Sequence, residues 1–260
     1  VDPAQTALVL ASIERPGIGT EPYRRHLDRL AGEVSDYAGE QGADKANGLD
    51  MRAEALCQVI ARRYGYAGTD DVYDDPDGAN LMGAIDLRTG LPVVLGIIYI
   101  DAARALGWTI DGLDFPARFL VRLCAGNRRI ILDPFANGRI LGPQEMRQLS
   151  KAAAGNHAEL TPAHYKAMDN REILLRAHNH IKVRLLRADR LDDALEAIET
   201  MLLFAPKAAE LWREAGLLNA RLDKVTAAVA ALEEFLLHNT GDSARYRTSI
   251  LLQELRGRLS

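Results

Sequence analysis

Two side chains that could act together stand on neighbouring segments in the middle of the chain. Residues 117–123 and 128–133 are short, mainly apolar segments separated by turn-forming residues 124–127, which predicts an antiparallel hairpin. With a tight turn, Arg118 lies opposite Asp133. Directly opposed side chains have Cβ atoms about 4.5–5.5 Å apart, so we expect the guanidinium and the carboxylate to touch.

The same register predicts which face of the hairpin is buried. It pairs Phe119 with Leu132 and Val121 with Ile130, and this wholly apolar face is expected to form the core side. The arginine–aspartate pair then lies on the face away from the core.

Spacing alone leaves two interpretations of this pair open. An exposed cross-strand ion pair would contribute at most about 1 kcal/mol to stability. The alternative is a functional site, because Asp133 stands at the end of a strand, directly before Pro134, where a carboxylate is well displayed.

Other reactive groups are poorly placed. Cys124 belongs to the hairpin turn, about 20 Å along the strand from Arg118. Cys57 lies on an early predicted helix, and its side chain is expected to serve in packing. The acidic segment 70–78 departs from a calcium loop, since Tyr73 and Ala84 occupy ligand positions. The six histidines show no metal-ligand spacing. We therefore expect no metal and no cofactor.

Helices must position the hairpin. A nearly all-apolar helix is predicted for residues 93–106, after the chain-breaking segment 88–92. Thr89 and Tyr99 carry hydroxyl groups near the start of this helix, but the sequence shows no general base that would activate either as a nucleophile. Four more helical segments come before it: residues 4–14, 21–38, 48–64 and 80–87.

Composition excludes several classes of protein. The chain has 260 residues, 48% of them hydrophobic, and a net charge of −4, which gives no basic field for nucleic acid. No apolar run reaches the roughly 18 residues of a membrane span. Two cysteines make no disulfide framework, which favours a reducing, cytoplasmic location. The chain begins at Val1 rather than Met, so the sequence leaves open a removed targeting segment.

The C-terminal part repeats with a period of 34 residues, which is typical of tetratricopeptide repeats. The equivalent pairs are Ala194 and Ala228, Ile198 and Leu232, Leu202 and Leu236, and Leu203 and Leu237. Two units are predicted, 175–208 and 209–242, followed by a capping helix, and Trp212 marks the repeat surface. A plain helical bundle is the alternative. We expect one domain over 1–160 and a second over 165–260.

A series of motifs resembles the SirB1 family. It comprises Asp71-Val72-Tyr73-x-x-Pro76-x-x-x-Asn80, Arg88-x-Gly90-Leu91-Pro92, Pro116-Ala117-Arg118-Phe119 and Leu132-Asp133-Pro134-Phe135-x-x-Gly138. The resemblance implies an α+β, papain/transglutaminase-like domain of helices and a small antiparallel sheet, followed by all-α tetratricopeptide-like helices. It also implies a cleft that includes Asn80, Tyr99, Arg118 and Asp133.

The transglutaminase-like superfamily works through Cys, His and Asp, and the resemblance places these roles at about Val94, at Arg118 and at Asp133. Only the aspartate is retained. Residues 92–95 contain no Cys, Ser or Thr, and arginine stays protonated, so it cannot act as a general base. Thiol-based acyl transfer is therefore expected to be lost.

Three functions remain in competition. The first is a non-catalytic, regulatory module that binds a protein or peptide, with Arg118 receiving a carboxylate. The second is a cysteine-independent hydrolase or amide transferase using the remnant cleft around Asp133. The third is purely structural retention of the motifs. The missing base and nucleophile favour the first.

Overall fold

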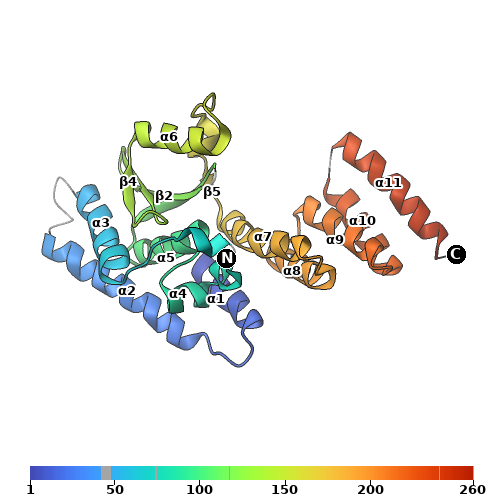
Figure 1. Cartoon of the computed structure of the whole chain (residues 1–260), viewed down its shortest axis with the longest axis horizontal. Coiled ribbons are helices and arrows are strands. Elements are labelled where there is room, and N and C mark those ends of the chain that lie inside the picture. The colour runs from blue at the N-terminus through green and yellow to red at the C-terminus, as the bar shows by residue number, and fades with distance from the viewer. Residues whose placement is uncertain (42–47, 74, 117, 240, 260) are drawn as a thin grey trace. The chain divides into compact units, whose positions relative to one another are not determined.

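The computed structural model describes residues 1–41, 48–73, 75–116, 118–239 and 241–259. They form two compact units, Val1–Ala177 and His178–Ser260 (Figure 1). The first unit combines helices with a five-stranded antiparallel sheet, and the second is helical, as the sequence predicts.

Helices dominate the first half of the first unit. In chain order they are α1 (Pro3–Glu14), α2 (Glu21–Gln41), α3 (Gly48–Leu56), the π-helical η1 (Cys57–Arg63), the short η2 (Asp70–Tyr73) and η3 (Pro76–Ala79), α4 (Leu81–Leu87) and α5 (Pro92–Ala105). Pro92 takes the first position of α5, where its missing N–H has no consequence. Almost every residue of α5 is buried, so this helix is the centre of the unit.

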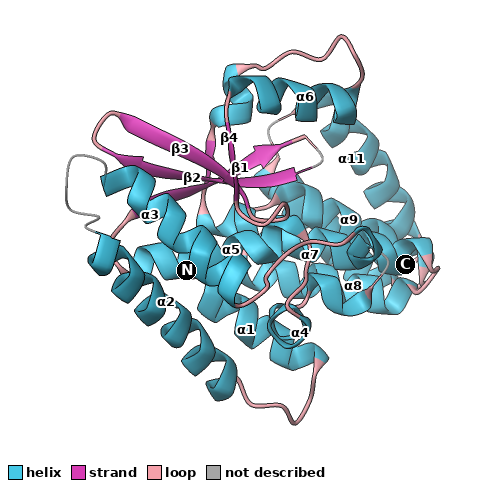
Figure 2. Ribbon diagram, turned by 60° about the vertical axis from the view of Figure 1, so that its left-hand side comes forward, coloured by secondary structure: helices cyan, strands magenta, loops and turns pink. Residues whose placement is uncertain are grey.

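The sheet lies between α5 and α6 (Pro143–Ala154), as Figure 2 shows. Its strand order is β4-β3-β2-β1-β5. The strands are β1 (Thr109–Phe115), β2 (Arg118–Ala125), β3 (Arg128–Asp133), β4 (Arg139–Leu141) and β5 (Ala167–Met168). Phe119 packs against α5 at Gly96, where an added Cβ would lie 2.3 Å from the ring.

The predicted hairpin register is wrong by two residues. Val121 pairs with Leu132 rather than with Ile130, because the two turn residues are Gly126 and Asn127. Gly126 has a φ of 56°, a conformation that glycine adopts without strain. A shift of two preserves the face of every side chain, since side chains alternate with a period of two.

The predicted exposed face of the hairpin is also wrong. Leu120, which shares the face of Arg118, is fully buried in a cluster with Leu113, Phe115, Leu141 and Met146 of α6. Both faces of the sheet are therefore covered, one by α5 and one by α6.

The first unit extends beyond the expected boundary at residue 160. β5 pairs with β1, so that Met168 lies opposite Gly112. The following helix α7 (Asn170–Arg187) buries Ile173 and Leu174 in its first turns. The segment after residue 160 thus completes the sheet, and Ala167–Met168 supplies its edge strand.

The second unit contains the C-terminal end of α7 and four further helices, α8 (Leu191–Phe204), α9 (Ala209–Arg221), α10 (Val225–His238) and α11 (Asp242–Gly257). Turns between its helices recur with the 34-residue period seen in the sequence. Asp189 and Asp223 are 34 residues apart, and their φ angles are 54° and 60°. Ala194 and Ala228, at the same period, are both fully buried.

No single helix in the described part of the chain is long and apolar enough to cross a membrane. The pair α4 and α5, bent by 86°, meets that requirement together by length and composition.

Candidate functional site: the Arg118–Asp133 pair

Asp133 is held by the backbone that follows it. One carboxylate oxygen, Oδ1, accepts hydrogen bonds from the N–H groups of Phe135 at 3.0 Å and Ala136 at 3.2 Å. The Asp133 carbonyl accepts a further bond from Gly138 N–H at 2.9 Å, which closes the turn. The side chain is 3% exposed. Burial raises the pKa of the Asp133 carboxyl, and the positive charge of Arg118 opposes this effect.

Arg118 meets the other carboxylate oxygen, as predicted. Its Nε lies 3.8 Å from Asp133 Oδ2, and its guanidinium carbon lies 4.3 Å from the centre of the Phe135 ring. The true register places the two residues diagonally, a separation that a long arginine side chain spans. The Arg118 side chain remains 26% exposed, so the pair opens to solvent through the guanidinium.

Tyr73 and Arg176 complete the surroundings, and the residue patterns alone did not identify either. The Tyr73 ring centre lies 5.9 Å from that of Phe135. Burial raises the pKa of Tyr73, and the charge and hydrogen bond of Arg118 oppose this effect. Arg176 of α7 pairs with Asp114 and donates a 2.7 Å hydrogen bond to the Arg118 carbonyl, which fixes the start of β2.

Tyr73 stands within the motif Asp71-Val72-Tyr73 that supports the family resemblance, so that motif is the signal by which it could have been found. Arg176 had no such signal, because its partners come from a sheet 58 residues earlier in the chain.

Val94, at the position implied for the nucleophile, is 1% exposed in the first turn of α5. Its neighbours Val93 and Leu95 are equally buried. The start of this helix therefore presents aliphatic side chains and no thiol or hydroxyl.

Tyr99 lies in the core beneath the turn that follows Asp133. It is fully buried, and its hydroxyl has no hydrogen-bond partner in the described structure. A Cβ at Gly138 would lie 2.6 Å from this oxygen. Burial raises the pKa of Tyr99 well above its usual range. Tyr99 therefore supports the turn from below rather than lining an open cleft.

Cys57 is a buried free thiol beside Tyr99, under the turn at Gly138. Its Sγ donates to the carbonyl of Gly138 at 2.9 Å, and burial raises its pKa to about 12. Burial therefore disfavours the thiolate that nucleophilic attack needs. Cys124 lies opposite Arg129 near the hairpin turn, remote from Asp133 along the strands.

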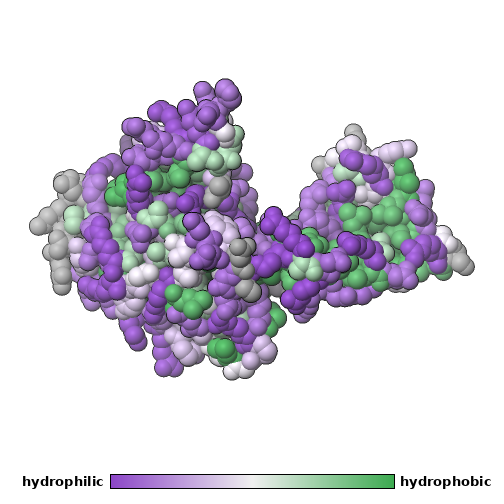
Figure 3. All heavy atoms as spheres, viewed as in Figure 1, coloured by the Kyte–Doolittle hydropathy of each residue, from purple (hydrophilic) through white to green (hydrophobic). Residues whose placement is uncertain are grey.

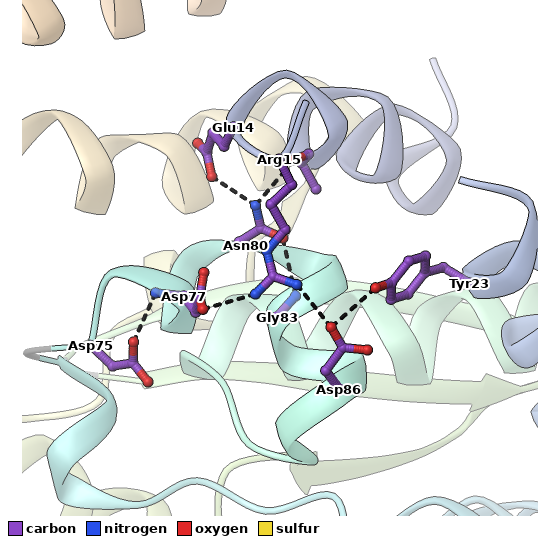
Figure 4. A network of polar contacts seen from close by, with 9 residues as sticks. Glu14, Arg15, Tyr23, Asp75, Asp77, Asn80, Gly83 and Asp86 are labelled. Atoms are coloured by element: carbon purple, nitrogen blue, oxygen red, sulfur yellow. Dashed lines mark hydrogen bonds and ion pairs between the residues drawn. The ribbon is translucent and has the colours of Figure 1, made fainter. Parts of the chain in front are cut away.

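Asn80 belongs to a different group of polar contacts, drawn in Figure 4. It caps α4, where its Oδ1 accepts from Gly83 N–H at 3.1 Å, and its Nδ2 donates to Glu14 at 2.8 Å. Beside it, Arg15 joins Asp77 and Asp86, each at 2.8 Å. This network ties α1 to α4, and Asn80 is not brought to the Arg118–Asp133 pair.

Trp212 lies in the second unit, half-buried in α9. Its indole Nε1 donates to the carbonyl of Pro206 at 2.8 Å, across the corner between α8 and α9. This bond orients the ring at the start of the second repeat. Among the described residues, no group of three or more His, Cys, Asp or Glu side chains could hold a metal ion.

Three ionisable side chains set the chemistry of this site. Asp133 is fixed and buried, Arg118 is permanently charged, and Tyr73 has a raised pKa. Arg118 stays protonated near neutral pH, so it cannot take up a proton in the role that the resemblance implies for a histidine at this position.

Comparisons with known proteins agree with this architecture. The family model described as "Transglutaminase-like superfamily" matches residues 21–179, and that described as "Tetratricopeptide repeat" matches residues 181–253. Among solved structures, the chain is similar to menin at 14% identity and a TM-score of 0.36, over 95% of this chain and 69% of menin.

Several bacterial proteins are similar along most of their length. A UPF0162 protein of Vibrio cholerae is 30% identical over 92% of this chain and 86% of its own. A UPF0162 protein of Xylella fastidiosa (strain Temecula1) is 29% identical over 89% of this chain and 82% of its own. YchA of Escherichia coli (strain K12) is 25% identical over 72% of this chain and 70% of its own. The chain therefore belongs to the transglutaminase-like superfamily, and it shares its tetratricopeptide extension and most of its length with the UPF0162 proteins.

Proposed function

We propose that this chain is a non-catalytic, regulatory member of its superfamily that binds a protein or peptide partner in the cytoplasm. The observation that carries the proposal is the partly exposed arginine, which stands against a buried carboxylate where the resemblance implies a histidine. The motif series further supports placing the chain in the SirB1 family.

Arg118 has the chemistry to receive a carboxylate. Its Nε faces Asp133, and its guanidinium is stacked on Phe135, so the group is held in one orientation. A guanidinium carries five N–H donors, and those directed away from Asp133 can form a bidentate pair with an incoming carboxylate. A peptide C-terminus is the simplest ligand that carries such a group.

The second unit gives a partner additional surface. Tetratricopeptide helices stack into extended surfaces that bind helical or extended segments. Leu203 and Leu237, one period apart, are 79% and 73% exposed. These leucines offer apolar contacts that a folded monomer does not use.

A library of peptides with free C-termini tests the proposal. We expect the wild-type protein to select peptides with a free C-terminal carboxylate. The same peptides should no longer bind when their C-terminus is amidated. The Arg118→Met variant should no longer bind the peptides that the wild-type protein selects. Arg128→Met is the matched control, because Arg128 lies on the same sheet, pairs with Asp50 and is 53% exposed. Selection that is unaffected by both amidation and Arg118→Met would overturn the proposal.

A cysteine-independent hydrolase or amide transferase remains the second candidate. The observation in its favour is Tyr73, whose ring lies 5.9 Å from that of Phe135 and whose pKa is influenced by the charges of both Arg118 and Asp133. Hydroxyl- and thiol-directed covalent probes test this function. Labelling that is lost in Tyr73→Phe would support it, and an unlabelled protein would eliminate it.

A further inference from the structure

A cavity of about 570 Å³ lies in the first unit beside α6, and it shares no residue with the Arg118–Asp133 pair. It is formed by α6, by the segment that follows this helix, and by η4 (Pro162–Tyr165). The lining residues are Pro143, Arg147, Lys151, Ala158, Glu159, Leu160, Thr161, Pro162 and Tyr165.

One wall of this α6 cavity is a single stripe of the helix. Pro143, Arg147 and Lys151 follow one another at intervals of four residues, so they share a face. Met146 and Leu149 lie on another face and pack against the sheet. Figure 3 shows hydrophilic side chains gathered over the outer part of α6. Packing of the helix thus directs both cations to the cavity.

The two cations have no anionic partner within the described residues. Neither Arg147 nor Lys151 forms an ion pair or a side-chain hydrogen bond with any described residue. Glu159 is the single acid among the lining residues, so the cavity carries a net positive charge. The chain as a whole carries −4, which makes this local excess of positive charge distinctive.

The opposite wall is apolar and fixed. Leu160 and Tyr165 line the cavity and also pack against the core cluster under α6. Within the described residues, the backbone N–H groups of Glu159 and Leu160 donate no backbone hydrogen bond. The apolar floor thus lies beside two residues whose N–H groups make no backbone hydrogen bond, and main-chain hydrogen bonds contribute affinity when a protein binds an extended peptide.

We infer that the α6 cavity binds an extended acidic peptide segment with carboxylates two residues apart. Side chains on one side of an extended chain repeat about every 6.6–6.8 Å. Residues four apart on a helix rise by about 6 Å, so Arg147 and Lys151 match a Glu-x-Glu spacing. Since most lining residues are exposed, the cavity is shallow, and a peptide that runs through it fits better than an enclosed small molecule.

A display library of random heptapeptides, fused so that no free C-terminus is presented, tests this inference. Wild-type protein should enrich peptides with two acidic residues separated by one position. The double variant Arg147→Glu, Lys151→Glu should lose this enrichment, and Arg118→Met should retain it. The matched control is Arg25→Glu, Arg29→Glu, which makes the same charge change at the same spacing on the exposed face of α2.

An enriched peptide then allows a quantitative test by fluorescence anisotropy. We expect the double variant in α6 to weaken binding at least tenfold, and increasing salt to weaken wild-type binding, because exposed charges are screened. Unchanged circular dichroism would show that the double variant is folded. Enrichment without acidic residues, or acidic enrichment that survives in the double variant, would overturn the inference.

Discussion

At the scale of single residues, Asp133 and Arg118 have unequal roles in the fold. Asp133 accepts two backbone hydrogen bonds in a buried position, whereas Arg118 is a quarter exposed and stacked on one ring. An unpaired buried donor costs about 1–3 kcal/mol, while a partly exposed guanidinium 3.8 Å from a carboxylate that keeps two other hydrogen bonds contributes less. The carboxylate therefore holds the turn, and the guanidinium reaches solvent.

We accordingly expect Asp133→Ala to destabilise the first unit by about 2–4 kcal/mol, because two N–H groups and one guanidinium lose their acceptor. Arg118→Met should cost less, about 1–2 kcal/mol, because the buried carboxylate loses its counter-charge but keeps both backbone hydrogen bonds. Urea unfolding followed by circular dichroism measures both values. An equal loss in the two variants would mean that the pair is structural only.

A second residue-scale prediction concerns His26. Its Nε2 lies 2.8 Å from the Tyr66 hydroxyl and 2.7 Å from Arg88, the first residue of the motif before α5. Burial and then the charge of Arg88 lower the His26 pKa from 6.5 to about 4. Between these pH values the unfolded chain binds a proton that the folded chain does not, so stability falls as pH falls from about 6.5 to 4.

His26 is partly exposed, so we expect this loss to amount to about 1–2 kcal/mol rather than the full linkage value. Urea midpoints measured at pH 7 and at pH 4.5 should differ less in His26→Gln than in wild type. A pH dependence that is identical in the two proteins would show that His26 is not the group responsible.

At the scale of elements, the turn from Asp133 to Gly138 joins the sheet to the buried side of α5. Gly138 has a φ of 69°, and a Cβ there would lie 2.6 Å from the Tyr99 hydroxyl and 2.8 Å from Cys57 Sγ. Gly126 in the hairpin turn has a similar φ of 56°, but its Cβ would meet nothing within 4 Å.

This pair of glycines separates backbone strain from packing. Gly126→Ala should cost about 1 kcal/mol through the positive φ alone, and Gly138→Ala should cost about 3 kcal/mol or more, since it adds an overpacked contact. Chemical unfolding of both variants provides the comparison. Equal losses would show that the turn does not rest on Tyr99 and Cys57.

The hairpin of β2 and β3 was predictable from the sequence in some respects and not in others. Alternation in residues 118–133 predicts the hairpin and its two faces, because the period of two survives a shift of two residues. The register itself depends on which residues form the turn. Both Ala125-Gly126 and Gly126-Asn127 are plausible turns, and the chain uses the second. The exposed face was predicted wrongly because the strands carry no sign that α6 covers them.

The functional residues divide in the same way. The predicted contact between Arg118 and Asp133 is confirmed, although the two residues stand diagonally across the strands rather than directly opposite each other. The contacts of Asn80 and Tyr99 depend on groups 66 and about 39 residues away, Glu14 and Gly138, which no local pattern brings together. Long-range packing, rather than propensity, therefore decides which motif residues support the fold.

At the scale of the whole molecule, the two compact units each contain one tryptophan, Trp108 in the first and Trp212 in the second. Leu232 is fully buried in the second unit, where it packs with Ala228, Leu252 and Leu255. Removing its side chain should cost about 2–4 kcal/mol, as for other buried leucines.

We expect Leu232→Ala to lower the urea midpoint reported by Trp212 more than that reported by Trp108. The Trp108→Phe and Trp212→Phe backgrounds isolate the two fluorescence signals. Leu120→Ala, in the core under α6, is the reciprocal control and should act mainly on the Trp108 signal. Equal shifts of both signals would mean that the units unfold as one.

The most direct test of the central claim is the affinity of one library-selected peptide, measured by titration calorimetry as the free acid and as the C-terminal amide. If Arg118 binds a carboxylate without catalysis, amidation should weaken binding about 10- to 100-fold, because the complex loses a hydrogen bond to a charged group. Arg118→Met should cause the same loss with no further effect of amidation, and the recovered peptide should be chemically unchanged. Equal affinity for acid and amide, or a cleaved or transferred peptide, would contradict the account.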